Sequence, residues 1–264
     1  MVYRTLLPPP ALSGFVRFFW VLEGTPEEVY HHRTLADGCA ELVFHYRGQF
    51  DEWHGTETEK SFTSGIHGQS RQFRRFSIGE AFGIFGTYLY SYVLPLLLRQ
   101  PASDLTNQMP DLSSAFGQAG ADLEEQVMLA PGTDVRAALV SSFLLERLHR
   151  TGPQPGVFSC IRSVIESQGL TRIDALADAY SLSPRQFGRK FHEFAGFPPK
   201  LFSRIVRFQS AISRPETFPS LTDLAYRCGY YDQSHFIHDF REFSGFHPGH
   251  FFFRENEATG WMGW

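Results

Sequence analysis

The sequence LADAYSLSPRQFGRKFHEFAGFPPKLF, residues 176–202, returns in altered form as LAYRCGYYDQSHFIHDFREFSGFHPGHF, residues 224–251. Matching residues lie 48 positions apart at first, as Leu176 and Leu224 do, and 49 apart after a one-residue insertion. The other matches are Ala177 with Ala225, Phe187 with Phe236, Phe191 with Phe240, Glu193 with Glu242, Phe194 with Phe243, Gly196 with Gly245, Phe197 with Phe246, Pro199 with Pro248 and Phe202 with Phe251. Chance does not produce such a register, so the last hundred residues contain an internal duplication.

Each copy reads as two short helices joined by a tight turn. A hydroxyl that can cap a helix opens each copy, Thr171 in the first and Ser220 in the second, with an acid three residues later. Gly229 supplies a residue tolerant of positive φ at the turn of the second copy. Ser183 and Pro184 then begin a second helix, with proline at its first position. The pattern predicts two helix-turn-helix units.

The second helix of each unit buries a pair of phenylalanines four residues apart and leaves polar side chains exposed. On the first unit these exposed positions are Arg185, Gln186, Gly188, Arg189 and Lys190, and on the second they are Gln233, Ser234, His235 and His238, with Arg241 just beyond. Arginine can read guanine with two hydrogen bonds, glutamine can read adenine, and serine is permissive. Charges at helical spacing usually belong to a solvated face, but the duplication, the caps and this chemistry together favour contact with DNA.

Residues 199–213, between the two copies, predict a connecting helix. Its apolar positions recur at helical spacing and face inward, which leaves Arg204 and Arg207 available to DNA phosphates. Such a helix would hold both recognition helices on one rigid unit. They could then enter successive major-groove faces about 34 Å apart, so that one chain covers about two helical turns.

The duplicated pattern resembles a known family of regulators. The residues that carry the likeness are Leu176-Ala177, Ser183-Pro184-Arg185, Phe187, Arg189, Phe191 and Gly196-Phe-Pro-Pro199, then Leu224-Ala225, Cys228-Gly229-Tyr230, Asp232-Gln-Ser-His-Phe236, Phe240 and Ser244-Gly-Phe-His-Pro248. Over about a hundred residues this pattern resembles the AraC/XylS family of bacterial transcription regulators. The resemblance implies a seven-helix DNA-binding domain. It assigns base reading to Arg185, Gly188 and Arg189, and to Gln233, Ser234, His235 and His238.

Two positions depart from the family's pattern. Gly188 has no side chain where the family often places a reading residue, and His238 replaces what is commonly arginine. The second helix is therefore expected to contribute less affinity. Residues 36–44, 65–69 and 104–105 also resemble the β-rich N-terminal domain of a subgroup of these regulators, and this likeness brings no ligand with it.

Charge divides the chain at residue 156. The first 156 residues carry 17 acidic and 12 basic side chains, and residues 157–264 carry 11 and 12, so the net charge of −4 arises in the first part. The segment TGPQPG, residues 151–156, contains two prolines and two glycines and predicts an interdomain linker. We therefore expect a sensory or association domain over residues 1–150, a DNA-binding domain over 157–255 and a tail over 256–264.

The first hundred residues are strand-like. Short aromatic and β-branched runs at 15–22, 39–46, 72–78 and 82–88 are separated by Gly, Asp, Glu and His clusters. A helical pattern follows, and its apolar stripe between residues 135 and 148 is expected to pack on the domain's own sheet or against a second copy. The predicted fold class is α+β: a β-rich N-terminal barrel or sandwich with trailing helices, then an all-α domain of two helix-turn-helix units.

An enzyme would have to use the N-terminal part. The candidate metal ligands there are His31, His32, His45 and His67, with Glu41 or Asp37. No HxH pair with a fixed downstream partner accompanies them, and histidines among strands are more often structural, so we predict neither enzymatic activity nor a metal or cofactor. A role in DNA-alkylation repair would need a reactive cysteine in a zinc-supporting cluster, which the isolated Cys39 does not provide.

Composition limits the cellular compartment and the kinds of binding partner that we expect. The three cysteines lie far apart, which argues against disulfides and favours a reducing cytoplasm. The longest apolar stretch, residues 83–98, falls short of the roughly 20 residues of a membrane span, and it predicts a buried strand followed by a short helix. The expected partners are double-stranded DNA, a small-molecule effector, a second copy of the chain and, for an activator, RNA polymerase; no membrane is expected. A protein-interaction module is the alternative, and it would show no salt-dependent DNA affinity.

Overall fold

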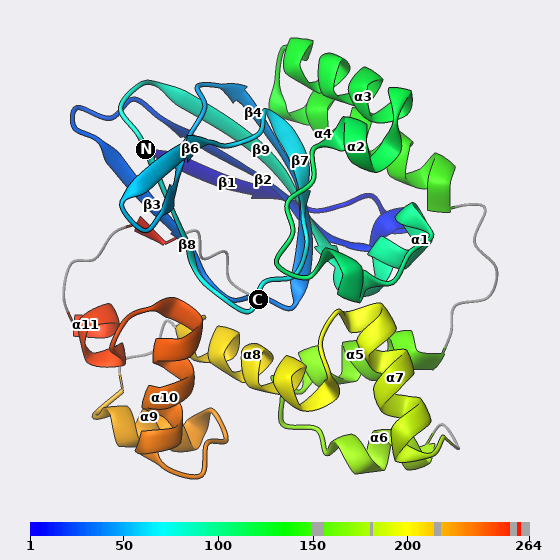
Figure 1. Cartoon of the computed structure of the whole chain (residues 1–264), viewed down its shortest axis with the longest axis vertical. Helices are drawn as coiled ribbons and strands as arrows, with labels where there is room; N and C mark the ends of the chain where they lie inside the picture. Colours follow the sequence, from blue (N-terminus) through cyan, green and yellow to red (C-terminus); the bar gives the residue numbers. More distant parts are fainter. Residues whose placement is uncertain (149–155, 180–181, 214–217, 254–257, 260–264) are drawn as a thin grey trace.

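The structure is a computed structural model of the whole chain, and it describes residues 1–148, 156–179, 182–213, 218–253 and 258–259. These residues form an N-terminal β-domain with trailing helices and a C-terminal layer of helices beneath it (Figure 1). The predicted α+β class is confirmed. The predicted linker at 151–156 and the tail at 256–264 lie almost wholly outside the described residues.

Two five-stranded sheets make the β-domain, and neither closes into a barrel within the described residues. The first has the order β1-β2-β9-β4-β7 and the second the order β10-β3-β8-β5-β6. The strands are β1 (Val2–Leu6), β2 (Val16–Gly24), β3 (Tyr30–Thr34), β4 (Cys39–Arg47), β5 (Asp51–His54), β6 (Glu57–Lys60), β7 (Ser64–His67), β8 (Arg74–Ile78), β9 (Phe82–Tyr90) and β10 (Ala258–Thr259). Of the two architectures expected from the sequence, the structure therefore shows the sandwich.

The central strands β9 and β4 of the first sheet are buried on both faces, which explains their nearly continuous aromatic and β-branched runs, whereas the edge strand β1 is exposed. One face contributes Trp20, Val43 and Tyr88 to a cluster that includes Phe76 of the second sheet. The opposite face belongs to a larger core that continues into the helices, and Phe44 is fully buried there. Strand β9 is buried along almost its whole length because it lies at the centre of this sheet.

Short helices follow the strands and cover one face of the first sheet. They are α1 (Leu94–Leu98), α2 (Leu112–Phe116), α3 (Gln118–Leu129) and α4 (Thr133–Leu148), with 3-10 turns η1 (Pro10–Leu12), η2 (Ser91–Val93) and η3 (Ala102–Leu105). The apolar stripe of α4 packs on α1 and α3 of its own domain, and α3 in turn contacts β4. The stripe is thus covered within its own domain, where Arg136 of α4 also lies 3.8 Å from the ring centre of Tyr46 on β4. Val135, at its start, is exposed.

The C-terminal layer contains the seven helices that the family resemblance implies. They are α5 (Gly156–Glu166), α6 (Ile173–Ala179), α7 (Pro184–Ala195), α8 (Pro199–Ile212), α9 (Leu221–Arg227), α10 (Gln233–Ser244) and α11 (Pro248–Phe253). Helix α8 connects the α6–α7 lobe to the α9–α10 lobe (Figure 1). None of the described helices is both long and apolar enough to cross a membrane.

Local capping chemistry sets most of these boundaries. Ser183 and Gln186 form a capping box at the start of α7, Ser220 caps α9, and Asp232 caps α10. The cap expected at Thr171 is wrong: α6 begins at Ile173, and the Thr171 hydroxyl bonds back to Ser163 and Ser167 around the end of α5.

The two domains share a continuous apolar core. Tyr92 stacks on Phe158 of α5 with ring centroids 4.6 Å apart, and Phe158 contacts Phe194 of α7 at 5.2 Å. Arg33 of β3 donates to the carbonyl of Ser244 and lies 3.9 Å from the ring of Phe246. The α6–α7 and α9–α10 lobes are therefore both docked on the β-domain.

One loop of the β-domain, residues 68–73, touches an equivalent corner of each lobe. Helices α7 and α10 end at Gly196 and Gly245, whose φ values of 76° and 74° favour glycine. A Cβ on Gly196 would lie 1.3 Å from the Gln69 amide, and one on Gly245 would lie 2.5 Å from the Phe73 ring. These two positions correspond in the duplication, so the loop holds both copies by the same feature.

Candidate nucleic-acid interface and effector pocket

Helix α7 presents the basic face predicted from the sequence. The aromatic rings of Phe187 and Phe191 are buried, which turns Arg185, Arg189 and Lys190 outward, and all three are exposed. Gln186 is also exposed, but its side chain is engaged in the capping box with Ser183. Gly188 lies on the same face with open space around its Cα, so the surface there is flat enough for close approach.

Helix α10 presents a more neutral face. Its exposed side chains are Ser234, His235, His238 and Arg241. Gln233 is half-buried and accepts a hydrogen bond from Thr222 of α9, so it is already engaged in the absence of DNA. This face carries one arginine, where α7 carries two arginines and a lysine. A weaker contribution of the second helix stays a prediction.

Both reading helices are attached to the β-domain near their C-terminal ends. Helix α7 contacts η2, η3 and α1, and Thr106 donates to the Gly196 carbonyl at 2.8 Å. Arg33 and Ala36 bond the carbonyls of Ser244 and Phe243 at the end of α10. The amino-terminal ends, which contact base edges in helix-turn-helix proteins, point away from the β-domain (Figure 1). The docking therefore leaves the predicted reading surfaces open.

Arg204 occupies a different environment from the one predicted. Its guanidinium pairs with Asp239 at 2.7 Å and with Glu242 at 2.6 Å, both on α10. Hydrogen bonds to these carboxylates raise the pKa of Arg204 above its ordinary value. Arg204 therefore ties α8 to α10 in this structure, and a phosphate contact from it stays a prediction.

Arg207 is also held within the domain. It donates to the carbonyl of Gly229 at 3.3 Å and lies over the ring of Tyr230 at 5.1 Å. Gly229 has a φ of 72°, as the predicted turn requires. Arg207 thus supports the turn of the second unit, and a phosphate contact from it stays a prediction.

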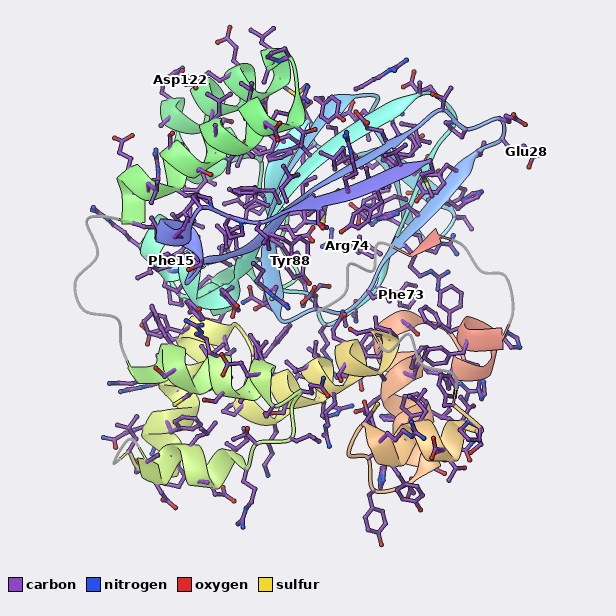
Figure 2. The ribbon with its side chains drawn as sticks, turned by 180° about the vertical axis from the view of Figure 1, so that it is seen from behind. Phe15, Glu28, Phe73, Arg74, Tyr88 and Asp122 are labelled. Atoms are coloured by element: carbon purple, nitrogen blue, oxygen red, sulfur yellow. The ribbon has the colours of Figure 1, made fainter. Side chains whose placement is uncertain are left out.

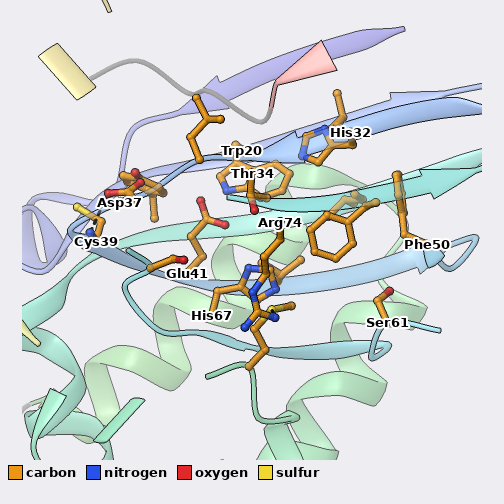
Figure 3. A pocket seen from close by; sticks show the side chains of 18 of the residues that line it. Trp20, His32, Thr34, Asp37, Cys39, Glu41, Phe50, Ser61, His67 and Arg74 are labelled. Atoms are coloured by element: carbon orange, nitrogen blue, oxygen red, sulfur yellow. Dashed lines mark hydrogen bonds between the residues drawn. The ribbon is translucent and has the colours of Figure 1, made fainter. Parts of the chain in front are cut away.

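The β-domain contains a cavity of about 320 Å³ between its sheets, which sequence reasoning did not identify. This volume is at the small end of the range for ligand pockets, roughly 300–1,000 Å³. Its lining combines aromatic and aliphatic side chains with many polar and ionisable ones (Figure 3). The lining includes Trp20, Tyr30, His32, Asp37, Cys39, Glu41, His45, Phe50, Ser61, His67, Arg74, Phe76, Tyr88 and Gln209. The sequence signal was the alternation in β4, where Cys39, Glu41, Val43 and His45 share one face.

Several polar atoms of this lining have no partner among the described residues. The indole nitrogen of Trp20, the Nε2 atom of His67 and the hydroxyl of Ser61 are buried and unpaired. Burial lowers the pKa of His32 to about 4 and that of His67 to about 3, so both imidazoles are neutral at pH 7. Burying polar groups without partners is costly, which is typical of a pocket that binds a polar molecule.

The histidines predicted as alternative metal ligands do not form a metal site. His45 bonds the Phe62 carbonyl at 2.8 Å, and His32 pairs with the Tyr30 hydroxyl. Within the described residues, the one group of His, Cys, Asp and Glu ligand atoms close enough for an ion is on α10, at His238, Asp239 and Glu242. Arg204 pairs with both of those carboxylates. The three cysteines are buried, and none of them forms a disulfide within the described residues.

Comparisons with known proteins separate the two domains. Residues 4–111 match a family model described as a domain of unknown function, DUF6597, and residues 176–254 match one described as a helix-turn-helix domain. The HTH-type transcriptional activator RhaS of Escherichia coli K12 is 38% identical over 71 residues, which are 26% of this chain and 25% of RhaS. The chain thus spans about a quarter of the length of the curated relatives it matches.

Solved structures of two regulators align with most of the chain at low identity. ToxT from Vibrio cholerae has a TM-score of 0.47 and 13% identity, covering 95% of this chain and 98% of ToxT. The AraC-like transcriptional activator CuxR has a TM-score of 0.30 and 11% identity, covering 88% of this chain and 83% of CuxR. The matched helix-turn-helix domain, the similarity to RhaS and the two α8-linked lobes confirm, for the C-terminal domain, the resemblance to the AraC/XylS family predicted from the sequence.

Proposed function

We propose that this protein is a sequence-specific DNA-binding transcription regulator, and not an enzyme, whose β-domain binds a small-molecule effector. The observation that carries the proposal is the pair of linked helix-turn-helix units with exposed basic and polar reading faces. A bacterial regulator of this kind acts in the cytoplasm, where the DNA is. RhaS is an activator, so RNA polymerase is the further partner we propose.

Helices α7 and α10 are proposed to make different contacts with DNA. Arg185 and Arg189 of α7 are the proposed base readers because each can make two hydrogen bonds to a guanine edge. Lys190 and Arg241 are proposed phosphate contacts, and Gly188 lets the backbone of α7 approach the groove closely. Ser234, His235 and His238 are proposed to read bases from α10, with Gln233 joining them once it leaves Thr222.

The segment of residues 35–37 lies between the pocket and the DNA-binding domain, and this position supports coupling of ligand binding to DNA binding. Leu35 and Asp37 line the pocket, and between them Ala36 donates to the Phe243 carbonyl of α10 and accepts from Gln209 of α8. Gln209 itself also lines the pocket. A ligand that moves this segment would shift the helices attached to it, and such a shift changes DNA affinity only if the ligand binds the two arrangements differently.

The function is tested by mapping the chromosomal sites that the protein occupies and then measuring affinity for the recovered sequence as a function of salt. A regulator binds that sequence far more tightly than random DNA, and the logarithm of the affinity falls linearly with the logarithm of salt concentration. A protein-interaction module would show neither property. Equal affinity for recovered and random DNA would reject sequence-specific recognition.

A further inference from the structure

Glu41 is the one acidic side chain of the pocket that has no partner among the described residues. It extends from the middle of β4, where it lies directly opposite His67 of β7 and Tyr88 of β9. Figure 3 shows its carboxylate directed into the middle of the lining residues. Within the part of the chain that the structure describes, Glu41 makes no hydrogen bond and no ion pair.

The other charged groups of the pocket each have a partner. Arg74 pairs with Glu52 at 3.1 Å and donates to the Asn107 carbonyl. Asp37 accepts from the Cys39 amide at 2.8 Å, and the positive charge of Arg17 acts on it. Glu41 therefore remains as the uncompensated acid of the cavity.

The surroundings of Glu41 cannot solvate a negative charge well. Burial, with the nearby Asp37, raises its pKa to about 8. The neighbouring imidazole of His67 is neutral. The ring of Trp20 lies against the backbone of Gly86, so closely that a Cβ added to Gly86 would lie 2.0 Å from the indole. An ionised carboxylate in such surroundings costs free energy, so Glu41 keeps its proton near pH 7 unless a cation joins it and takes the proton's place.

Aromatic rings beside a carboxylate suit a cationic ligand. Trp20 offers its ring to an ammonium group by cation–π interaction, while the carboxylate neutralises the charge. The ring of Tyr88 is already engaged, because Arg17 lies over it at 5.5 Å and Phe18 stacks on it at 4.9 Å. Phe50 and Phe76 line the same cavity and would cover an apolar body. The cavity of about 320 Å³ limits that body to a small molecule.

We propose that this pocket binds a small organic cation, an ammonium or guanidinium group on an apolar body, with Glu41 as its counter-ion. This proposal rests on the proposed function in one respect: the bound cation is called an effector because the protein is proposed to be a regulator. Binding is measured without DNA, so failure of the pocket assignment and failure of DNA recognition are separate results.

The test uses the full-length chain and three probes of similar shape: phenethylamine, phenethyl alcohol and hydrocinnamate. Isothermal titration calorimetry should show the amine binding at least about tenfold more tightly than the alcohol, since a hydrogen bond to a charged group contributes about 1.5–3 kcal/mol. Hydrocinnamate should bind most weakly. Tighter binding of hydrocinnamate would overturn the proposal and assign the pocket to anions through Arg74, and equal binding of amine and alcohol would assign it to neutral ligands.

The variant Glu41→Gln removes the charge and keeps the shape. It should lower the affinity for phenethylamine about tenfold or more and leave that for the alcohol within about twofold. Glu59→Gln is the matched control, because Glu59 is exposed on β6, away from the cavity. An undiminished amine affinity in Glu41→Gln would reject Glu41 as counter-ion. No saturable binding of the amine to the unaltered protein would also reject the proposal, and this result does not depend on how the variant folds.

Discussion

Two arginines that look alike in the sequence have opposite surroundings in the structure. Arg189 is exposed on α7, whereas Arg204 is bound to Asp239 and Glu242. Helical spacing places both on polar positions, but it cannot show that two acids from a helix 35 residues away meet one of them. A change at each arginine should therefore have a different effect.

Replacing Arg189 by Ala should reduce affinity for the cognate site by about 1 to 3 kcal/mol and relax sequence preference at one position. Unfolding should be almost unchanged, because the side chain is exposed. Fluorescence anisotropy with cognate and random DNA measures both effects. Arg47→Ala, on an exposed end of β4, is the control. An unaltered footprint would mean that another face of α7 reads the DNA.

Replacing Arg204 by Ala should mainly reduce stability. Asp239 has 8% of its side chain exposed, so removal of its partner leaves a buried carboxylate unpaired. The free energy of unfolding should fall by about 1–3 kcal/mol, below the range for a fully buried pair because Arg204 is partly exposed. Urea denaturation checks this. Unchanged stability with a uniform loss of DNA affinity would restore the phosphate contact predicted from the sequence.

Glu41 should make the folded protein less stable as pH rises. Its folded pKa of about 8 exceeds the ordinary 4.5, so its protonated form favours the folded state and that contribution is lost between these values. His32 and His67 have lowered pKa values in the folded state, so they make the protein more stable as pH rises, but only up to about pH 6.5. Asp37 lowers stability as pH rises, but only up to about pH 6. From about pH 6.5 to about pH 8.5, unfolding free energy should therefore fall by an amount on the order of a kcal/mol or more relative to Glu41→Gln. Parallel curves for the two proteins would contradict this.

Among the elements, the helices with local signals were predicted best. Helix α7 begins at Pro184 because Ser183 and Gln186 close a capping box, and it ends at a glycine in the left-handed region. Each of these features is contained in consecutive residues. The strands at 39–47 and 82–90 were also visible from their composition.

Features that depend on distant residues escaped the sequence. The cavity requires side chains from both sheets and Gln209 from α8, and no local pattern brings these together. The start of α6 was misplaced because Thr171 had a better partner in Ser167 than in its own helix. The exposure of most predicted reading residues follows from helix periodicity, whereas the ion pairs of Arg204 depend on the packing of α8 against α10.

The cap of α10 allows a test at this scale. Asp232→Ala removes the acceptor for the His235 amide, a bond of 2.8 Å, and should reduce stability by about 0.5–2 kcal/mol. Fraying of the first turn should also weaken DNA binding, because Ser234 and His235 lie there. Asp232→Asn keeps a good cap and should retain most stability. Thermal unfolding and anisotropy measure the two effects, and equal losses in both variants would show that the charge, and not the cap, matters.

In the whole molecule, the β-domain holds the second lobe through a few polar contacts. Arg71 donates to Glu242 at 2.6 Å and 2.9 Å, next to the bond between Ala36 and Phe243. Arg71→Ala should loosen this contact and raise hydrogen exchange of the Ala36 amide several-fold, with little change in global stability because the pair is half exposed. Arg47→Ala is again the control. Unchanged exchange would show that the apolar contacts suffice.

The loop of residues 68–73 has a consequence for operator geometry. The loop contacts Gly196 in one repeat and Gly245 in the other, so a movement of the loop away from one repeat also changes its contact with the other. The two lobes are therefore expected to shift in unison, and the protein should tolerate little variation in the spacing of its half-sites. The duplication has thus given the two lobes equivalent contact points, Gly196 and Gly245, for a single loop of the β-domain that has no duplicate.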